Sequence, residues 1–516
     1  MKVFYNAVVY TGSRFAQAFA VEDGRFVFVG SDAEAPEGER IDLGGAFVCA
    51  GFNDSHMHLL NYGQSLHMAP LHAHTSSLTD MTDCLRNAQP DRGWILGRGW
   101  NQDHFSDVRR MPCREDLDGV SRSFPVCAVR ACGHALVVNS KALEILGITC
   151  STPSPEGGEI DFENGRFFDN AMDLVLNAIP APDTQTIKEY IRAACAQLNR
   201  RGITSCQSDD YGVFRQTPWQ TVNNAYRELE SEGALTVRVR QQANLTTVPE
   251  LLGFLEAEHP ATAMYSMGPL KLLGDGALGA RTALLSRPYA DAPDTRGLGV
   301  FTARQFDALI GCAHAHGMQT AVHCIGDACL DLVLDAIEKA QAAHPRPDAR
   351  HGIVHCQITR PDQLRRIAQN HLHVYAQSIF LDYDIHIVRR RAGEDLARTS
   401  YSWKTLLDLG ATVSNGSDCP VEAPDVMAGI QCAVTRQDLH GCPPYLSTEA
   451  FSVKEALDSF TSAGAWASFE EHIKGQITPG HYADFTILGA DPFLTDPAQL
   501  KDIPVLQTWL NGERVW

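Results

Sequence analysis

Strand-like and helix-like patterns alternate through the middle of the chain. Stretches in which apolar residues recur every three or four positions lie between most of the apolar runs that are typical of buried strands. Several helical patterns end in a glycine, as at Gly202, Gly317 and Gly410, which is a usual stop signal. This repeated order predicts an α/β fold, a parallel (β/α)8 barrel with helices outside, and a doubly wound open sheet is the alternative. The expected strands are 46–52, 203–208, 236–244, 270–274, 319–325, 352–358, 373–380 and 411–415.

Both ends of the chain are rich in short strands and lack long helices. The first part alternates over 3–11 and 25–30, and the last part repeats this texture over 483–488 and 505–510. Two such ends can pair in space. We therefore expect a small β-sandwich domain built from residues 1–48 plus 470–516, with the barrel over 49–469 inserted between them.

A long stretch between the first and second expected barrel strands interrupts the alternation of strands and helices. It is irregular, and it contains a run rich in glycine and proline at 152–158. We interpret residues 75–180, approximately, as an insertion over one end of the barrel. A separate domain in sequence order is the alternative.

Composition narrows the classes of partner. The 516 residues include 43 Lys plus Arg and 62 Asp plus Glu, so the formal charge is −19 and binding to nucleic acid or to an anionic membrane surface is disfavoured. The 15 cysteines are scattered and form no Cys-x-x-Cys motif, which suits a reducing compartment. We find no signal-peptide pattern and no apolar run of about 18 residues. The sequence thus predicts a cytoplasmic protein with no membrane segment.

The sequence contains four His-x-His pairs, although 20 histidines in 516 residues give roughly one such pair by chance. The pair His314/His316 ends a helical pattern and the pair His371/His373 begins a strand, so both are interpreted as structural. A third lies in the irregular insertion and has no assigned role. The four pairs are His56/His58, His72/His74, His314/His316 and His371/His373, of which the second lies in the insertion and the last two are the structural ones.

The first pair follows a buried strand. His56 and His58 come just after the apolar run that ends at Ala50, and active sites of barrels lie at the carboxyl ends of their strands. Residues two apart on an extended chain point the same way, so both imidazoles can reach one ion. The alternative is a pair of hydrogen-bonded loop residues.

Histidine or aspartate also occurs at the carboxyl ends of three other expected barrel strands. His323 closes the fifth expected strand, His355 closes the sixth, and Asp418 follows the eighth. A barrel brings these strand ends together, so the histidines and the aspartate form a candidate metal site. Lys271 lies inside the fourth strand, where a charge is costly. It either pairs with a barrel carboxylate or, as a neutral amine, captures CO2 as a carbamate that could bridge two ions.

These residues carry a family resemblance that extends over nearly the whole chain. The sequence resembles the amidohydrolase superfamily, and most closely the amidohydrolase family 3 group that includes N-substituted formamide deformylases. Residues 381–400 match none of its motifs, so the resemblance assigns no substrate contacts there. The matching segments are 51–58, 133–134 with 139–140, 155–158, 271–276, 323–327, 355–356, 416–421 and 475–485.

The resemblance implies a distorted (β/α)8 barrel with a β-sandwich made from both termini. It also implies that His56 and His58 bind the more buried metal together with Asp418, and that His323 and His355 bind a second. Lys271, if carboxylated, would bridge them. Mixed histidine and carboxylate ligands suit zinc, with manganese, iron and cobalt as alternatives.

The implied activity is hydrolysis of a carbon–nitrogen bond of a small molecule, an amide or an N-formyl or N-acyl compound, by a metal-bound hydroxide. Asp418 would be the catalytic residue that carries the proton from the hydroxide to the leaving nitrogen. His134 would bind the substrate carbonyl or be structural. Trp100 and Asp103 are further candidates for substrate binding, with core packing as the alternative for Trp100. Asp275 is either a pocket residue or a turn residue.

Two other functions remain open at this point. Heterocycle deaminases of this superfamily use one metal and a His-x-x-Glu pair, whereas Gly326 and Ile358 stand three residues after His323 and His355. A non-catalytic scaffold would have lost its metal, but all six candidate ligands are present. An acidic enzyme of this size is often a homodimer, which we expect here.

Overall fold

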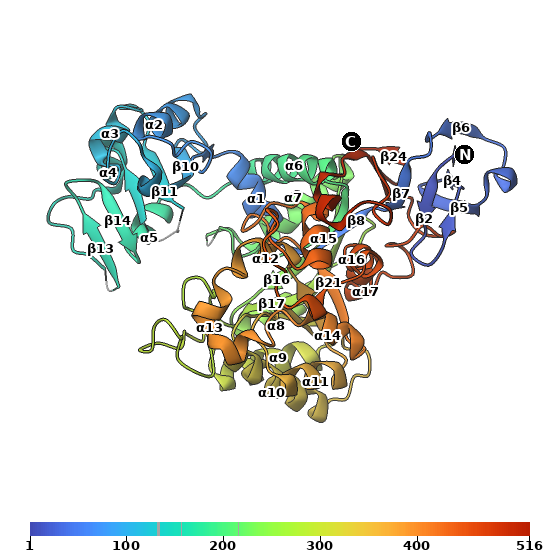
Figure 1. The fold of residues 1–516 in the computed structure, drawn as a ribbon. Helices are drawn as coiled ribbons and strands as arrows, with labels where there is room; N and C mark the ends of the chain where they lie inside the picture. The colour runs from blue at the N-terminus through green and yellow to red at the C-terminus, as the bar shows by residue number, and fades with distance from the viewer. Residues whose placement is uncertain (132–134, 156, 215) are drawn as a thin grey trace. The chain divides into compact units, whose positions relative to one another are not determined.

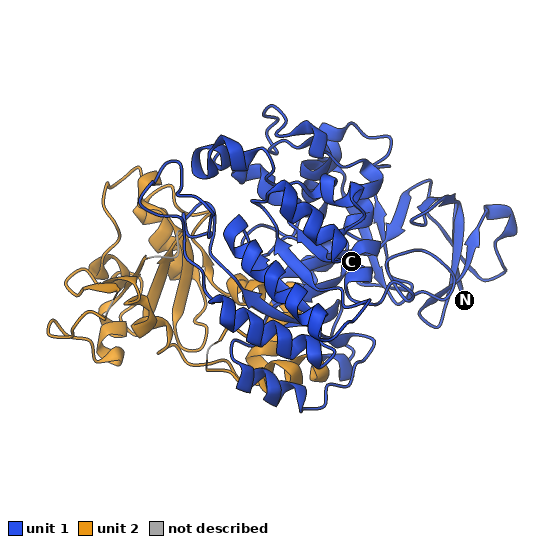
Figure 2. Ribbon diagram, turned by 90° about the horizontal axis from the view of Figure 1, so that it is seen from below, with its two compact units in different colours: residues 1–59, 195–210, 229–516 blue, residues 60–194, 211–228 orange. Residues whose placement is uncertain are grey.

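The computed structural model describes residues 1–131, 135–155, 157–214 and 216–516. Its chain divides into two compact units, which are described separately (Figure 2). The first unit comprises residues 1–59, 195–210 and 229–516, and the second comprises residues 60–194 and 211–228. Within the described residues, no helix combines the length and the apolar character needed to cross a membrane.

A parallel eight-stranded sheet forms a nearly closed barrel in the first unit (Figure 1). Its two edge strands are joined across the seam, since the Ser414 hydroxyl donates to Ser55 Oγ at 2.7 Å and accepts from His373 Nε2 at 2.7 Å. The predicted barrel is confirmed and the open sheet is wrong. The strands, in sheet order, are β8 (Phe52–Met57), β15 (Ile203–Ser208), β16 (Arg238–Asn244), β17 (Tyr265–Leu273), β18 (Thr320–Cys324), β19 (Gly352–His355), β20 (His373–Ala376) and β21 (Thr412–Asn415).

The helices between these strands follow the predicted pattern. The helix α9 is typical: the Thr302 side chain caps its first turn by accepting from the N–H of Gln305, and Gly317, at φ +80°, follows its last turn. The helices of the first unit are α8 (Val248–Leu255), α9 (Ala303–Ala315), α10 (Asp327–Ala343), α11 (Pro361–Gln369), α12 (Leu381–Asp384), α13 (Val388–Ala397), α14 (Trp403–Asp408), α15 (Val426–Thr435), α16 (Val453–Ser459) and α17 (Ser462–Ala467). Most residues of α6 (Thr184–Arg200) and α7 (Trp219–Ser231) belong to the second unit.

The first expected strand, 46–52, corresponds to two strands. The segment β7 (Phe47–Ala50) belongs to a different sheet, and the barrel begins only with β8. The chain passes from one sheet to the other at Gly51, where a Cβ atom would lie 2.2 Å from Thr204 Oγ1. His56 therefore lies within a barrel strand and not after its end, which corrects the expectation from the sequence.

The strands at the two ends of the chain form two smaller sheets, of which one combines strands from both ends and the other contains N-terminal strands only. In one of them β22 lies between β7 and β23, antiparallel to both. Phe4, Phe19 and Phe485 pack between the sheets with ring centroids 4.8 to 5.1 Å apart. This arrangement fits the expected sandwich, although its boundaries stay a prediction. The sheet orders are β5-β4-β1-β6 and β24-β23-β22-β7-β2-β3, with β1 (Lys2–Tyr5), β2 (Val8–Tyr10), β3 (Phe15–Ala16), β4 (Ala18–Glu22), β5 (Arg25–Gly30), β6 (Glu39–Asp42), β22 (Phe485–Leu488), β23 (Val505–Leu510) and β24 (Glu513–Arg514).

The second unit has its own six-stranded sheet, with an apolar cluster on each side. The sequence predicted an irregular insertion here and did not predict this sheet. The limits of 75–180 stay a prediction. The sheet order is β13-β14-β12-β11-β10-β9, and the elements are α1 (Leu59–Leu66), β9 (Ala69–Pro70), α2 (Leu78–Asn87), β10 (Ile95–Trp100), α3 (Arg114–Asp118), β11 (Val126–Arg130), β12 (Ala135–Val138), α4 (Ser140–Leu146), β13 (Gly158–Asp161), β14 (Arg166–Asp169) and α5 (Met172–Leu176).

Candidate metal centre

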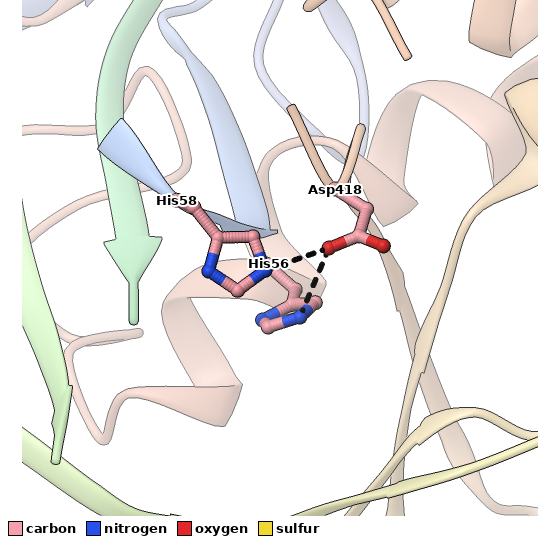
Figure 3. Close-up of side chains that lie close together, drawn as sticks. All are labelled: His56, His58 and Asp418. Carbon is pink, nitrogen blue, oxygen red and sulfur yellow. Dashed lines mark ion pairs between the residues drawn. The ribbon is translucent and has the colours of Figure 1, made fainter. Parts of the chain in front are cut away.

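Three predicted ligands meet at the end of the barrel where its strands terminate (Figure 3). His56 lies in β8, His58 follows it, and Asp418 follows β21, the strand at the other edge of the seam. The Oδ1 atom of Asp418 lies 3.3 Å from His56 Nε2 and 3.1 Å from His58 Nε2. Both His56 and Asp418 are buried. Side chains far apart in the sequence thus place three potential ligand atoms around one point.

The other ring nitrogen of each histidine has a hydrogen-bond acceptor. His56 Nδ1 donates to Gln242 Oε1 at 2.7 Å, and His58 Nδ1 donates to the backbone carbonyl of Asp209 at 3.0 Å. These bonds favour the tautomers in which Nε2 carries the lone pair. Both lone pairs then face Asp418. Metal-binding histidines in proteins are usually held in this way.

The cluster of His56, His58 and Asp418 is suited to binding a cation. His56 Nε2 and Asp418 Oδ1 are both buried and lie 3.3 Å apart. Burial lowers the pKa of His56 to about 4, whereas for His58 the hydrogen bond and charge of Asp418 outweigh burial and raise the pKa to about 9. Burial opposes ionisation of Asp418, but its bonds to both histidines hold its pKa well below the usual value. An ionised carboxylate facing two imidazoles fits a divalent cation, which would replace the proton on His58.

Two more predicted ligands adjoin this group. His355 Nε2 lies 3.9 Å from Asp418 Oδ2, and its Nδ1 donates to Gln377 Oε1 at 2.7 Å. The ring of His323 lies 4.4 Å from that of His355. Burial and the neighbouring His323 hold the pKa of His355 well below its usual value, so its imidazole is neutral. A neutral imidazole is the form that binds a metal.

His323 presents the opposite nitrogen. Its Nε2 lies 3.2 Å from the Gly276 carbonyl and 3.3 Å from Asp275 Oδ1. These acceptors hold the proton on Nε2 and leave the lone pair on Nδ1. His323 would therefore use Nδ1 as its ligand atom, whereas the other three histidines would use Nε2.

Lys271 is buried inside the barrel near the carboxyl end of β17, with an exposed fraction of 1%. Its Nζ lies 3.7 Å from Asp209 Oδ2, so the expected pairing with a barrel carboxylate is present. The positive charge of Lys271 also helps to lower the pKa of His56 and His355. Carboxylation of this lysine stays a prediction.

The supporting residues were not predicted from the sequence. Gln242, Gln377 and Asp209 hold the ligands, but the sequence shows only polar residues within or just after apolar strands. The pair Gln241-Gln242 in an expected buried strand was the available signal. A buried amide needs partners, and the sequence does not show which partner each one finds.

Asp275 holds two loops in place. It is buried, and its carboxylate accepts from the N–H groups of Leu284 at 2.8 Å, Ile325 at 3.0 Å and Gly326 at 2.8 Å. Both oxygens are engaged by these bonds. The geometry gives Asp275 a positioning role beside His323, and its predicted contact with substrate stays untested.

The remaining substrate-binding candidates belong to the second unit. Trp100 is fully buried in an apolar cluster of that unit, and its Nε1 donates to the Ala128 carbonyl at 2.9 Å. Asp103 is exposed and lies 3.4 Å from Arg130. His134 lies outside the described residues. The roles of these three residues toward substrate stay predictions.

Comparison with known proteins identifies the family of this chain. Residues 39–516 match the family model described as the amidohydrolase family. The chain belongs to the amidohydrolase family. It is 34% identical to the putative amidohydrolase YtcJ of Bacillus subtilis over 100% of this chain and 99% of that protein. It is 26% identical to the N-substituted formamide deformylase of Arthrobacter pascens, with 96% and 94% of the two chains covered.

A solved structure shows the same fold. The uncharacterized metal-dependent hydrolase from Pyrococcus furiosus has a TM-score of 0.81 and 31% identity, covering 95% of this chain and 99% of that one. As a member of the amidohydrolase family, the protein is a metal-dependent hydrolase. The resemblance found in the sequence is thereby confirmed at the level of the family and its fold.

Proposed function

We propose that this amidohydrolase cleaves a carbon–nitrogen bond, other than a peptide bond, in a small amide or in an N-formyl or N-acyl compound. The observation that carries the proposal is the convergence of His56 Nε2 and His58 Nε2 on Asp418 Oδ1, with His355 beside them. The bond type is supported by the similarity to a protein named as an N-substituted formamide deformylase. An apolar N-substituent is part of the proposal.

The donor set fits divalent ions. His56, His58 and Asp418 would hold one ion, and His323 with His355 would hold a second, with Lys271 bridging as a carbamate. Nitrogen and carboxylate ligands suit zinc, so zinc is the proposed metal. When bound, such ions supply Lewis acidity and water that is activated near neutral pH.

Asp418 would be the residue that moves the proton. Its carboxylate is ionised, because its bonds to His56 and His58 hold its pKa well below the usual value. Its Oδ1 faces these two histidines, which leaves Oδ2 to accept a proton from the attacking water and return it to the leaving nitrogen. Burial of the carboxylate keeps bulk water from competing for this proton. His134 would bind the substrate carbonyl, and Trp100 and Asp103 would shape the pocket.

The test combines metal analysis with a substrate panel. We expect at least about one divalent ion per chain, loss of activity after chelation, and recovery with zinc, manganese, iron or cobalt. N-formyl and N-acyl amines with apolar substituents are assayed beside heterocyclic amines. Turnover of the heterocyclic amines alone would establish a deaminase instead, and protein that binds no ion after supplementation would be a scaffold.

A variant pair tests Asp418. Asp418→Asn should abolish turnover while substantial metal stays bound, because the amide cannot accept the proton. His371→Asn is the matched control, since His371 is exposed and its φ of +51° suits asparagine. Normal turnover in Asp418→Asn would remove this residue from the mechanism.

Two further parts of the proposal concern the cell and the assembly. We propose a homodimer in the cytoplasm that acts on a small molecule and not on nucleic acid or membranes. Analytical ultracentrifugation of the purified protein tests the dimer, and a single species with the mass of one chain would contradict it. Fractionation of the source cells tests the location.

A further inference from the structure

A second group of metal-ligating side chains lies in the first unit and shares no residue with the site described above. It consists of His386, Asp438 and Cys442. One ligand atom from each lies within 4.8 Å of the other two. His386 comes from the turn between α12 and α13, whereas Asp438 and Cys442 come from the loop that follows α15. Two segments far apart in the sequence therefore supply an imidazole, a carboxylate and a thiol to one point.

The carboxylate of Asp438 is already oriented. Its Oδ1 accepts from the backbone N–H groups of His440 and Cys442, each at 3.0 Å. These bonds turn Oδ2 toward His386 Nε2, which lies 2.9 Å away. The same N–H groups lower the pKa of Asp438 to about 2, so the group is ionised at neutral pH. The oxygen that faces the histidine is thus fixed before any ligand arrives.

The sulfur of Cys442 is also placed by the backbone. It accepts from the N–H of Asp438 at 3.4 Å, an interaction that favours a thiolate. The thiol donates to the Pro443 carbonyl at 3.4 Å. Burial together with the charge of Asp438 nevertheless raises the pKa of Cys442, so the thiol keeps its proton unless a cation offsets that charge.

The site is open to solvent on one side. The His386 side chain is 53% exposed, and Cys442 is half-buried, whereas Asp438 is 8% exposed. A metal ion can therefore reach the group directly, and water can complete its coordination. An ion pair between His386 and Asp438 alone would give the nearby sulfur no role.

We propose that His386 Nε2, Asp438 Oδ2 and Cys442 Sγ bind a zinc-class divalent cation. Nitrogen, oxygen and thiolate sulfur together are ligands that zinc and cobalt accept in tetrahedral sites, with water in the fourth position. Binding breaks the S–H bond of Cys442, forms a metal–sulfur bond and releases the proton to solvent. Magnesium and calcium prefer oxygen ligands and are excluded by this set.

The bound ion would connect two segments that already touch. Asp382 Oδ1 accepts from the N–H of Leu439 at 2.6 Å, so the α12 segment and the loop after α15 are in contact next to the site. An ion held by both segments would stabilise the folded protein, because the unfolded chain does not bring the three ligands together. The role is structural, at a place distinct from the catalytic site.

Cobalt titration tests the proposal, because a Co²⁺–thiolate bond has a charge-transfer absorption in the near ultraviolet. None of the six residues proposed for the catalytic site is a cysteine, so those ligands do not produce this absorption, and comparison with Cys442→Ser assigns it to the second site. With the catalytic site loaded, we expect the absorption to saturate at one further equivalent of Co²⁺. Zinc should displace the cobalt and raise the unfolding temperature.

Variants make the result decisive. Cys442→Ser should lose the absorption, and Asp438→Asn and His386→Gln should each weaken cobalt binding by more than about tenfold. Cys150→Ser removes an exposed thiol elsewhere and is the matched control, which should behave like the natural protein. Turnover should be unchanged in Cys442→Ser, so the outcome is independent of the catalytic proposal. No thiolate absorption, or an equal absorption in Cys442→Ser, would overturn the site.

Discussion

Replacing Gln242 by leucine should weaken metal binding without touching any ligand atom. Gln242 lies on β16, fully buried, and its Oε1 accepts from His56 Nδ1 at 2.7 Å. Leucine is apolar, branches one carbon closer to the backbone and offers no acceptor. His56 would then keep a buried N–H without a partner, or would move its proton to Nε2, where it blocks the lone pair needed for the metal.

The size of the effect follows from these two costs. A buried donor left without a partner costs about 1–3 kcal/mol, and loss of a partner behind a metal ligand weakens metal affinity by about 10- to 100-fold. The two estimates overlap, since each factor of ten in affinity corresponds to about 1.4 kcal/mol. Gln242→Leu should therefore raise the dissociation constant for zinc by about 10- to 100-fold.

Competition with a chelator of known affinity measures this constant, and urea unfolding of the metal-free protein measures any general loss of stability. Gln241→Leu is the matched control. This neighbour is equally buried, but its Oε1 has no hydrogen-bond partner and it contacts no candidate ligand through a side-chain bond. Equal zinc affinity in the natural protein and Gln242→Leu, or an equal loss in both variants, would refute the role given to Gln242.

Three further outcomes are expected. Lys271→Met should lose one ion per chain by elemental analysis. Reconstitution of the natural metal-free protein should require bicarbonate. Full metal content in the variant would argue against a carbamate bridge. Arg238→Met should lower the free energy of unfolding by about 3–5 kcal/mol in urea, because it leaves the buried Asp484 without its partner. In the natural protein Arg238 Nε lies 2.6 Å from Asp484 Oδ2. An unchanged midpoint of urea unfolding would contradict this. Burial, with the charge of Arg350, lowers the pKa of His373 to about 3, so between pH 6.5 and 3 the unfolded state binds the extra proton and stability falls as pH falls. His373→Gln should reduce that slope by about 1.4 kcal/mol per pH unit, measured by urea unfolding at several pH values, and an unaltered slope would show that His373 is not a source of acid lability.

The barrel could be predicted because buried parallel strands are continuous apolar runs separated by amphipathic helices. The same property explains the error at the first strand. The residues of β7 and β8 are all buried, so hydrophobicity does not mark the change of sheet at Gly51. Only the close approach of Thr204 requires glycine there, and that contact comes from a strand about 150 residues away in the chain.

The ligands could be predicted from their position at strand ends, whereas their orientation could not. Whether a histidine offers Nε2 or Nδ1 depends on which acceptor lies behind it. For His56 the acceptor is two strands away, and for His355 it follows the adjacent strand. For His323 the acceptors are Gly276 and Asp275, which the chain brings up on the opposite side of the ring. Strand register sets these contacts, and the sequence does not display it.

The interactions that close the barrel and those that align the ligands are therefore linked. Ser55, which receives the seam hydrogen bond from Ser414, is adjacent in the chain to His56, and its carbonyl accepts from Gln242 Nε2 at 3.3 Å. A change that shifts the seam moves His56 relative to Gln242 before it exposes much apolar surface. Metal affinity depends on this alignment within fractions of an ångström, whereas the stability of the sheet depends on burial spread over many residues. Damage at the seam, as in Ser414→Ala, should thus appear first as loss of metal and only later as loss of fold.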